Sequence, residues 1–263
     1  KDSIHFIDTN VFRLLGAPDS VNIYKGQYWG VLTNNFLHIY LSQLIINCIG
    51  IIIFGYFIER RIGFMKFSFI VILACIIPSI IQLNLTNQPG IGLSGVNFTL
   101  FGYIISKSIK NKEFRLKWIS VYLTIMVLIV LYFNIYNIYT ENVYRTEAMS
   151  FGFLFGLLLG FLSNRKIWVK SLVLFNIMFF ALLTLWYAPW STEWQVFKGV
   201  EAHKTKQYKL AKKRYDKALK IDPNNKQALK NLELLKLDKL KSKAYKAHMK
   251  EHYQEAKKYM KKF

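Results

Sequence analysis

Cysteine and acidic residues are scarce in this sequence, and each scarcity excludes a class of protein. The 263 residues include only two cysteines, Cys48 and Cys75, and both lie inside apolar runs. A disulfide framework and a CxxC metal or redox site are therefore excluded, and we expect no metal and no cofactor. Acidic residues number 15 against 36 Lys+Arg, a formal charge of +21, while 53% of the residues are apolar. This combination is unusual for a soluble domain and typical of membrane spans joined by charged loops.

Long apolar runs fill residues 36–189, whereas basic residues gather in the last quarter of the chain. Four runs are long enough to cross a hydrocarbon core of about 30 Å: Phe36–Ile58, Phe67–Leu85, Leu116–Tyr139 and Ile167–Ala188. Two shorter runs, Leu93–Ser106 and Ala148–Leu162, are counted as spans too, although each is only about 21 Å long as a helix. The sequence thus predicts an all-α polytopic bundle with six visible spans, followed by a small α-helical domain.

The short loops predict how the bundle is oriented. Glu59–Lys66, Lys107–Lys117 and Arg165–Lys170 are basic, whereas Thr86–Ile91 and Thr140–Glu147 are neutral or acidic. Because basic loops stay in the cytoplasm, residues 1–35, the loop before Ser94 and everything after Trp190 are expected on the outer side. The richness in Ile, Asn and Lys indicates an AT-rich bacterium, so the expected membrane is the bacterial cytoplasmic (inner) membrane.

Polar residues within the apolar runs are candidates for function, because polar groups in hydrocarbon are costly. Gln43 and Asn47 are four residues apart and share one face of the first span. Ser94, in the tetrapeptide Gly92-Leu93-Ser94-Gly95, lies at the outer end of a span too short to reach the surface. We expect it at a helix N-terminus, which favours developing negative charge, below a wet cavity. Hydrogen bonding between helices and close packing of small residues are the alternative explanations.

Taken together these residues form a wider pattern. It consists of Trp29, Thr33, His38, Gln43, Asn47 and Glu59, then Gly92-Leu93-Ser94-Gly95 and Gly102, then Gly152, Gly156 and Gly160. The pattern resembles the rhomboid intramembrane serine protease family from about Gly26 to Leu162. The resemblance implies a short central helix that carries the serine, and cleavage of membrane proteins near their spans. It also implies a further span before Lys1.

The resemblance assigns roles residue by residue. Ser94 matches the nucleophile and Asn47 an oxyanion-site residue, while Gln43 stands where that site usually has histidine. The helix-packing positions are Gly95, Gly102, Gly152, Gly156 and Gly160. The catalytic histidine of the family precedes the first glycine of the last helix by three residues, and here that residue is Met149.

A thioether cannot take the proton of a serine hydroxyl, so the loss of histidine at Met149 predicts an inactive member, a pseudoprotease. Such a protein is expected to bind a membrane-protein client or its transmembrane segments, or to serve as a subunit of a membrane complex. The alternative is an active serine endopeptidase that uses Ser94 with a base not recognised in the sequence. A transporter is disfavoured because no charged residue lies in the middle of a span.

The basic C-terminal region contains a second pattern. Gly199, Tyr208, Ala211, Tyr215, Ala218 and Pro223 resemble one tetratricopeptide repeat (TPR), and Tyr253, Ala256 and Tyr259 a partial second copy after a long helix from Lys226 to about His248. A single repeat cannot bury its apolar face alone, so we expect an extracytoplasmic protein partner, with Tyr253 and Tyr259 as partner-binding candidates. Anionic lipid headgroups are another candidate partner, and nucleic acid is not expected.

The predicted domains follow from these patterns. Residues 1–35 form an extracytoplasmic loop, 36–164 the rhomboid-like core, 165–190 an additional transmembrane helix and 191–263 the extracytoplasmic TPR-like domain. Ser191–Phe197 is expected to act as a short linker before that last domain.

Overall fold

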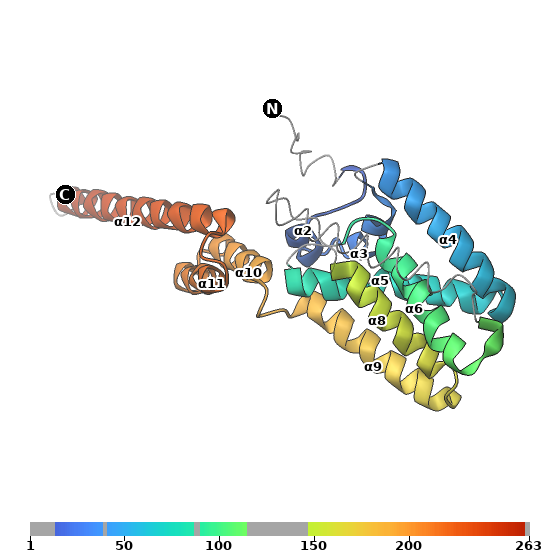
Figure 1. The fold of residues 1–263 in the computed structure, drawn as a ribbon. Coiled ribbons are helices and arrows are strands. Elements are labelled where there is room, and N and C mark those ends of the chain that lie inside the picture. Colours follow the sequence, from blue (N-terminus) through green and yellow to red (C-terminus); the bar gives the residue numbers. More distant parts are fainter. Residues whose placement is uncertain (1–13, 39–40, 87–89, 115–146, 261–263) are drawn as a thin grey trace. The chain divides into compact units, whose positions relative to one another are not determined.

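The computed structural model describes residues 14–38, 41–86, 90–114 and 147–260, and every regular element among these residues is helical (Figure 1). The chain divides into two compact units, Lys1–Ala188 and Pro189–Phe263, and each is described here by itself. The predicted all-α class therefore holds throughout the described part of the chain. The predicted span Leu116–Tyr139 lies outside the described residues.

In its described residues, the first unit is a bundle of three long apolar helices and two shorter ones. The long helices are α4 (Leu41–Ile62), α5 (Phe64–Thr86) and α9 (Ile167–Trp186), and each is long and apolar enough to cross a membrane. The shorter helices are α6 (Ser94–Lys110) and α8 (Glu147–Leu162). Small elements flank them: α2 (Ser20–Tyr24), α3 (Gly30–Thr33), the 3-10 turn η1 (Asn34–Phe36) and, after α6, η2 (Lys112–Phe114).

Three of the predicted spans coincide with the long helices, with shifted ends. The span predicted to begin at Phe36 begins at Leu41, because Phe36 closes η1 and Leu37 is extended. It continues to Ile62, where Gly63 with φ +83° makes the turn into α5. Most large apolar side chains on α4 and α9 are exposed, as expected for helices that face lipid.

The centre of the bundle is the pair α6 and α8, which run parallel and in very close contact. A Cβ built on Gly152 would lie 2.2 Å from the carbonyl oxygen of Gly95, and one built on Gly156 would lie 2.0 Å from that of Thr99. A Cβ on Gly102 would lie 2.3 Å from the carbonyl oxygen of Phe153. Since real Cβ atoms are not found this close to oxygen, only glycine allows the two backbones to approach in this way.

Aromatic and aliphatic side chains surround this helix pair. Phe101 on α6 contacts Phe54 on α4 and Phe153 on α8, with ring centroids 5.7 and 5.9 Å apart. The helix α9 packs on the same core through partly buried side chains: Leu174, Ile177, Met178 and Ala181. Asn84 Nδ2 on α5 also donates to Thr184 Oγ1 on α9, at 2.7 Å. This hydrogen bond joins the last apolar helix to the bundle.

The second unit contains α10 (Thr192–Lys204), α11 (Tyr208–Ile221) and α12 (Lys226–Met260). The expectation of a linker at Ser191–Phe197 is wrong, because the Ser191 hydroxyl caps α10 by accepting from the Trp194 backbone N–H at 3.2 Å. Gly199 on α10 lies against the Tyr215 ring on α11, where a Cβ would be 2.4 Å from Cε1. Burial raises the pKa of Tyr215 to about 12.

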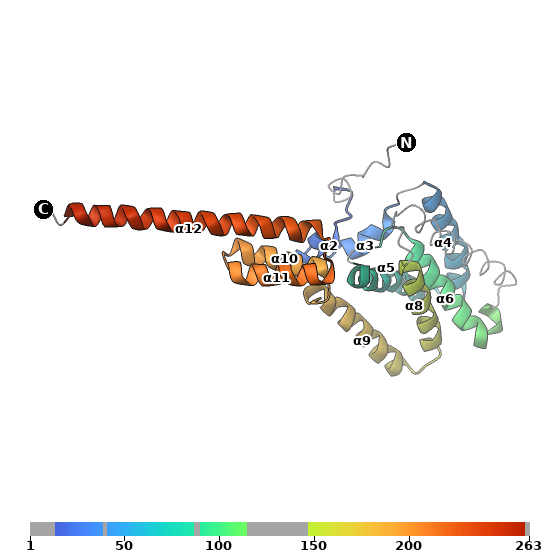
Figure 2. The same ribbon diagram turned by 60° about the vertical axis from the view of Figure 1, so that its left-hand side comes forward.

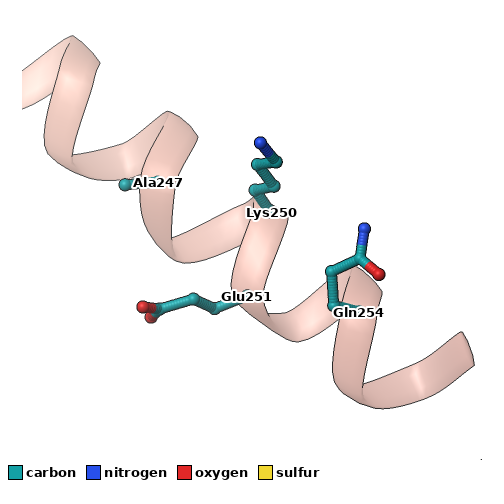
Figure 3. A pocket seen from close by; sticks show the side chains of 4 residues that line it. All are labelled: Ala247, Lys250, Glu251 and Gln254. Carbon is teal, nitrogen blue, oxygen red and sulfur yellow. The ribbon is translucent and has the colours of Figure 1, made fainter. Parts of the chain in front are cut away.

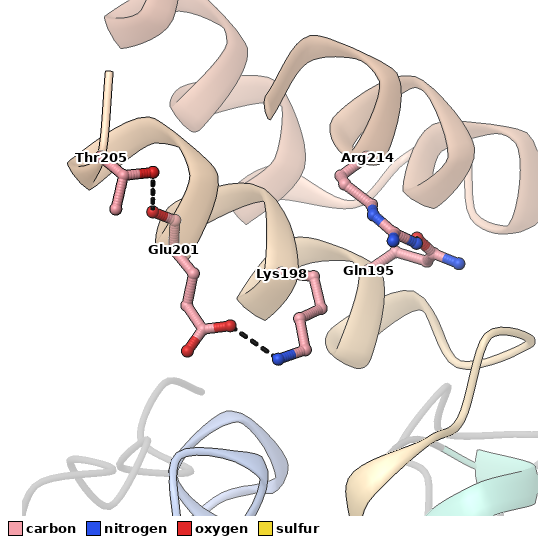
Figure 4. Close-up of polar contacts among 5 residues, drawn as sticks. All are labelled: Gln195, Lys198, Glu201, Thr205 and Arg214. Atoms are coloured by element: carbon pink, nitrogen blue, oxygen red, sulfur yellow. Dashed lines mark hydrogen bonds and ion pairs between the residues drawn. The ribbon is translucent and has the colours of Figure 1, made fainter. Parts of the chain in front are cut away.

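Polar contacts strengthen the pairing of α10 with α11 (Figure 4). Arg214 Nη1 donates to Oε1 of the buried Gln195 at 3.2 Å, and its guanidinium lies 5.2 Å from the Trp194 ring centroid. On α10 itself, Lys198 pairs with Glu201 at 2.7 Å. The helices α10 and α11 therefore pack on each other through both apolar and polar contacts.

The helix α12 extends as one element over 35 residues (Figure 2). Its first turns pack on α10 and α11 through Ala228, Leu232 and Leu235. The predicted partial second repeat is not a separate helix, since Tyr253 lies within α12. The reason is compositional, because no glycine or proline interrupts residues 226–260 and lysine, leucine and alanine favour helix.

The contact between α6 and α8 generates the first prediction. Replacing Gly156 by alanine places a methyl group against the Thr99 carbonyl, so the helices must separate, at a cost of about 1–3 kcal/mol or more. Thermal unfolding of the purified chain in detergent measures this loss. Leu154→Ala is the matched control, because Leu154 lies on the same helix and is 59% exposed. Equal unfolding temperatures for the two variants would contradict the role given to the glycine.

Candidate functional site

The loop before α6 places Ser94 at the first residue of that helix. Gly92 has φ +90°, a conformation that favours glycine, and its N–H donates to the Asn34 carbonyl at 3.0 Å. Ser94 is 7% exposed, and the residue before α6, Leu93, makes no side-chain cap. Ser94 therefore belongs to the first turn of α6, whose backbone N–H groups favour negative charge. Residues 87–89, part of the approach predicted to line a cavity, lie outside the described residues.

His38 is the centre of a polar network next to Ser94. Its Nδ1 lies 3.2 Å from the Phe36 carbonyl oxygen, so Nδ1 carries the proton and donates. Its Nε2 is then an acceptor, and it lies 3.0 Å from Asn47 Nδ2 and 3.3 Å from the Leu93 backbone nitrogen. The imidazole thus joins the segment before α4 to α4 itself and to the residue that precedes Ser94.

Asn47, the residue predicted for the oxyanion site, is held at both ends of its amide. Its Nδ2 donates to His38, while its Oδ1 and its backbone carbonyl accept from Asn97 Nδ2 at 3.1 and 2.9 Å. Asn97 lies one turn after Ser94 on α6 and is 4% exposed. Its Oδ1 faces Gly50 on α4, where a Cβ would lie 2.7 Å away. The amide of Asn47 therefore serves the contact between α4 and α6.

Asn97 was missed by the sequence analysis, although a signal for it existed. It is a polar residue within an apolar run, three positions after Ser94, on the helix predicted to carry the site. Its partner on α4 could not be identified from the sequence, because the pairing depends on which faces of two helices meet.

Gln43 borders the same loop. A Cβ built on Gly92 would lie 2.9 Å from Gln43 Nε2 and 3.3 Å from His38 Cδ2. The side chains of Gln43 and His38 therefore border Gly92, whose positive φ is the stronger reason for glycine there. The structure brings Ser94, Asn47 and Gln43 into one region, as expected from their positions in the sequence, and adds His38 and Asn97.

Met149, the residue predicted at the family's catalytic histidine position, lies at the same end of the bundle. Gly152 packs against the carbonyl of Gly95, the residue after Ser94, and Met149 lies one turn before Gly152 on α8. Met149 is half-buried. Within the described part of the bundle His38 is the one imidazole, and its Nε2 already accepts from two donors.

The predicted partner-binding tyrosines belong to the other unit. Tyr253 is 62% exposed on α12. Tyr259 lies on the same helix, and its side chain is outside the described atoms. Among the described residues no group of His, Cys, Asp and Glu side chains could hold a metal ion.

Comparison with known proteins gives a consistent family. The model of the Rhomboid domain matches residues 25–166. The chain is 28% identical to "Rhomboid protease GluP" of Bacillus subtilis over 127 residues, which is 48% of this chain and 25% of that protein. It is 29% identical to "RHOMBOID-like protein 6, mitochondrial" of Arabidopsis thaliana, over 39% of this chain and 34% of that protein. It is also 28% identical to "RHOMBOID-like protein 5" of the same plant, over 57% and 48%. The chain therefore spans between a quarter and about half of the length of these relatives.

The polar network around His38 can be tested directly. His38→Leu leaves the Leu93 N–H and the Asn47 amide without their acceptor, which should cost about 1–3 kcal/mol of folding free energy. The expected result is a lower unfolding temperature in detergent. Ser42→Ala, at an exposed position on α4, is the control and should unfold like the unaltered chain. A similar result for both variants would show that the network contributes little.

Proposed function

The chain belongs to the rhomboid family, and from this premise we propose that it is a non-catalytic member, a pseudoprotease that binds a membrane-protein client. It is an integral membrane protein, with three helices in its described part that are long and apolar enough to span. Its relative in Bacillus subtilis is named a protease. The loss of catalysis is therefore proposed for this chain and not for that relative.

The observation that carries the proposal is the chemistry around Ser94. A serine hydroxyl becomes an effective nucleophile only when an adjacent base takes its proton. At the family's histidine position this chain has Met149, whose thioether cannot accept a proton at neutral pH. Loss of one member of such a catalytic unit removes most of the rate. The scaffold around Ser94 can remain intact because the glycine contacts between α6 and α8 do not involve that histidine.

The oxyanion position supports the same proposal. Stabilising an oxyanion requires N–H groups aimed at the place where negative charge develops. One N–H of the Asn47 amide donates to His38, and the amide oxygen is held by Asn97. Gln43 has an amide N–H to offer but no imidazole, so it cannot supply a positive charge.

A second candidate is an active serine endopeptidase, and one contact favours it. His38 Nε2 lies 3.3 Å from the backbone nitrogen of Leu93, the residue that precedes Ser94. To serve as the base, His38 would have to give up its hydrogen bonds with Leu93 and Asn47 and turn towards Ser94. Cleavage by the unaltered chain separates the two candidates. Its loss in His38→Gln, which keeps an amide oxygen that can accept from Leu93 and Asn47 but has no basic nitrogen, would identify His38 as the base.

Proteolytic inactivity is the main prediction. The purified chain should not be labelled at Ser94 by fluorophosphonate probes and should not cleave a transmembrane substrate, because the base is absent. Ser94→Ala is the control for background in both assays. Met149→His should restore cleavage above the Ser94→Ala background if Gln43 and Asn47 still support an oxyanion. Cleavage by the unaltered chain that disappears in Ser94→Ala would overturn the proposal.

We propose further that the C-terminal unit is a TPR-like docking module for a protein partner with an acidic surface. From Lys198 to the end, this region has 21 Lys+Arg and 7 Asp+Glu. Large apolar side chains are also exposed along α12 beyond its packed first turns, with exposed fractions of 53% at Leu237, 63% at Leu240 and 65% at Tyr245. Cations beside apolar side chains suit an acidic, partly apolar partner.

The surface near Tyr253 suits a partner that lies against it better than a small ligand held inside a cavity. A shallow depression there is lined by Ala247, Lys250, Glu251 and Gln254, all from α12 (Figure 3). A depression made by one helix cannot enclose a small ligand, whereas a second helix could lie along it. Tyr215, by contrast, is completely buried against Gly199 and is a packing residue.

The cellular location is part of the proposal. The basic loops after α4, after α6 and before α9 support a cytoplasmic position for that end of the bundle. The C-terminal unit, which follows α9, would then be extracytoplasmic, at the inner membrane of a bacterium.

Docking by the C-terminal unit predicts the result of a truncation. A chain that ends after Pro189 should keep a folded bundle, because helices in a membrane satisfy their own backbone hydrogen bonds. It should lose the proteins that co-purify with the full chain in mild detergent, as measured by quantitative mass spectrometry. The double variant Leu237→Ser/Tyr253→Ser should lose them as well, whereas Lys204→Gln on α10 should not. If the truncated chain keeps the same partners in the same amounts, docking belongs to the bundle.

A further inference from the structure

Cations gather at the end of the bundle where α6 terminates and α8 turns into α9. They are held in place by aromatic rings beneath their side chains. Lys107 Nζ lies 5.4 Å from the Phe114 ring centroid, and Lys110 Nζ lies 5.3 Å from that of Phe161. Arg165 shares the Phe161 ring at 5.6 Å. Such contacts order flexible side chains and leave their charged ends available.

Lys107 and a further lysine, Lys170, both contact one turn. Lys107 Nζ, from α6, donates to Asn164 Oδ1 at 3.1 Å. Lys170 Nζ, from α9, donates to the backbone carbonyl of the neighbouring residue Ser163 at 2.5 Å. Both acceptors are neutral, and each ammonium has three N–H groups. Two half-buried positive charges from different helices are thus fixed on either side of the turn between α8 and α9.

The charge of this pair is not balanced within the described residues. No carboxylate there lies within 4 Å of either ammonium. The acidic residue of η2, Glu113, instead accepts from the Asn111 amide at 3.4 Å, and its backbone carbonyl accepts from Arg61. Burial lowers the pKa of Lys107, and the positive charge of Lys170 lowers it further. A pair of like charges in this position is costly unless an anion binds between them.

We propose that Lys107 and Lys170 form a binding site for a phosphate group at this end of the bundle. Two ammonium groups with unused N–H donors match the oxygens of a phosphate, which accepts charge-assisted hydrogen bonds from both. The site is separate from the region around Ser94, and it does not depend on whether the chain is a protease.

The phosphate belongs either to a phospholipid headgroup or to a soluble phosphate. Both present the same kind of oxygens to the two ammonium groups. The surroundings suit a headgroup, because Ile167 and Trp168 at the start of α9 are 77% and 63% exposed. Exposed tryptophan at a helix end is typical of the membrane interface, where phosphodiesters lie. Basic side chains at this depth are attracted to anionic lipid.

The test compares the full chain in nanodiscs of phosphatidylcholine with discs of equal parts phosphatidylcholine and phosphatidylglycerol. Phosphatidylglycerol should raise the unfolding temperature of the unaltered chain, because a ligand that binds the native state stabilises it. In Lys107→Gln and Lys170→Gln the shift should shrink, and native mass spectrometry should show roughly fivefold weaker retention of phosphatidylglycerol for each lysine lost. Lys170→Arg, which keeps the charge, should retain most of the shift.

Lys66→Gln is the matched control, since Lys66 is an exposed lysine in the first turn of α5 and its loss changes the net charge equally. A loss of retention in Lys66→Gln as large as in Lys107→Gln would overturn the site, because the attraction would then be diffuse. Inorganic phosphate added to the phosphatidylcholine discs, against sodium chloride of equal ionic strength, identifies the source. Stabilisation there that depends on Lys107 and Lys170 supports the site with a soluble ligand. If neither phosphatidylglycerol nor phosphate changes the unfolding temperature of the unaltered chain, the proposal is wrong.

Discussion

The rest of the bundle depends on the direct backbone contact between α6 and α8. Gly152 and Gly156 lie against the carbonyls of Gly95 and Thr99, two pairs that are spaced by four residues on both helices. Lipid gives no hydrophobic force between helices, so association relies on close packing and on contacts between polar backbone groups. The parallel register that results sets the start of α8 beside the start of α6. It therefore sets which part of α8 lies near the start of α6. In this chain that part is the first turn of α8, which contains Met149.

The polar residues of α4 show how a catalytic scaffold can serve packing. One of the two N–H groups of the Asn47 amide donates to His38. Its oxygen accepts from Asn97, so the amide holds α4 to α6 and to the loop before Ser94. In hydrocarbon an unpaired polar group costs free energy. The network stabilises the bundle because it gives these polar side chains hydrogen-bond partners.

The bundle and the C-terminal unit carry their positive charges in different arrangements. In the bundle, Lys107 and Lys170 are fixed by neutral acceptors on one turn. In the C-terminal unit the lysines follow the exposed length of α12, beyond the part that packs through Ala228 and Leu235. The first arrangement is a localised site for one anion, and the second is an extended surface. The difference comes from burial, because only partly desolvated charges gain strongly from a specific partner.

The sequence alone determined the helical class and three of the long apolar helices, because each rests on local periodicity and length. The same is true of the glycine positions and of the residue types at Ser94, Asn47 and Met149, which the family pattern identifies. Local signals also misled, since the residues expected as a linker after Ser191 form a capped helix. Only the tertiary structure decided that Asn97 and His38 hold Asn47, and that Lys107 and Lys170 donate to neighbouring residues of one turn. Those pairs come from segments about 10 to 60 residues apart, so their contact depends on how whole helices pack.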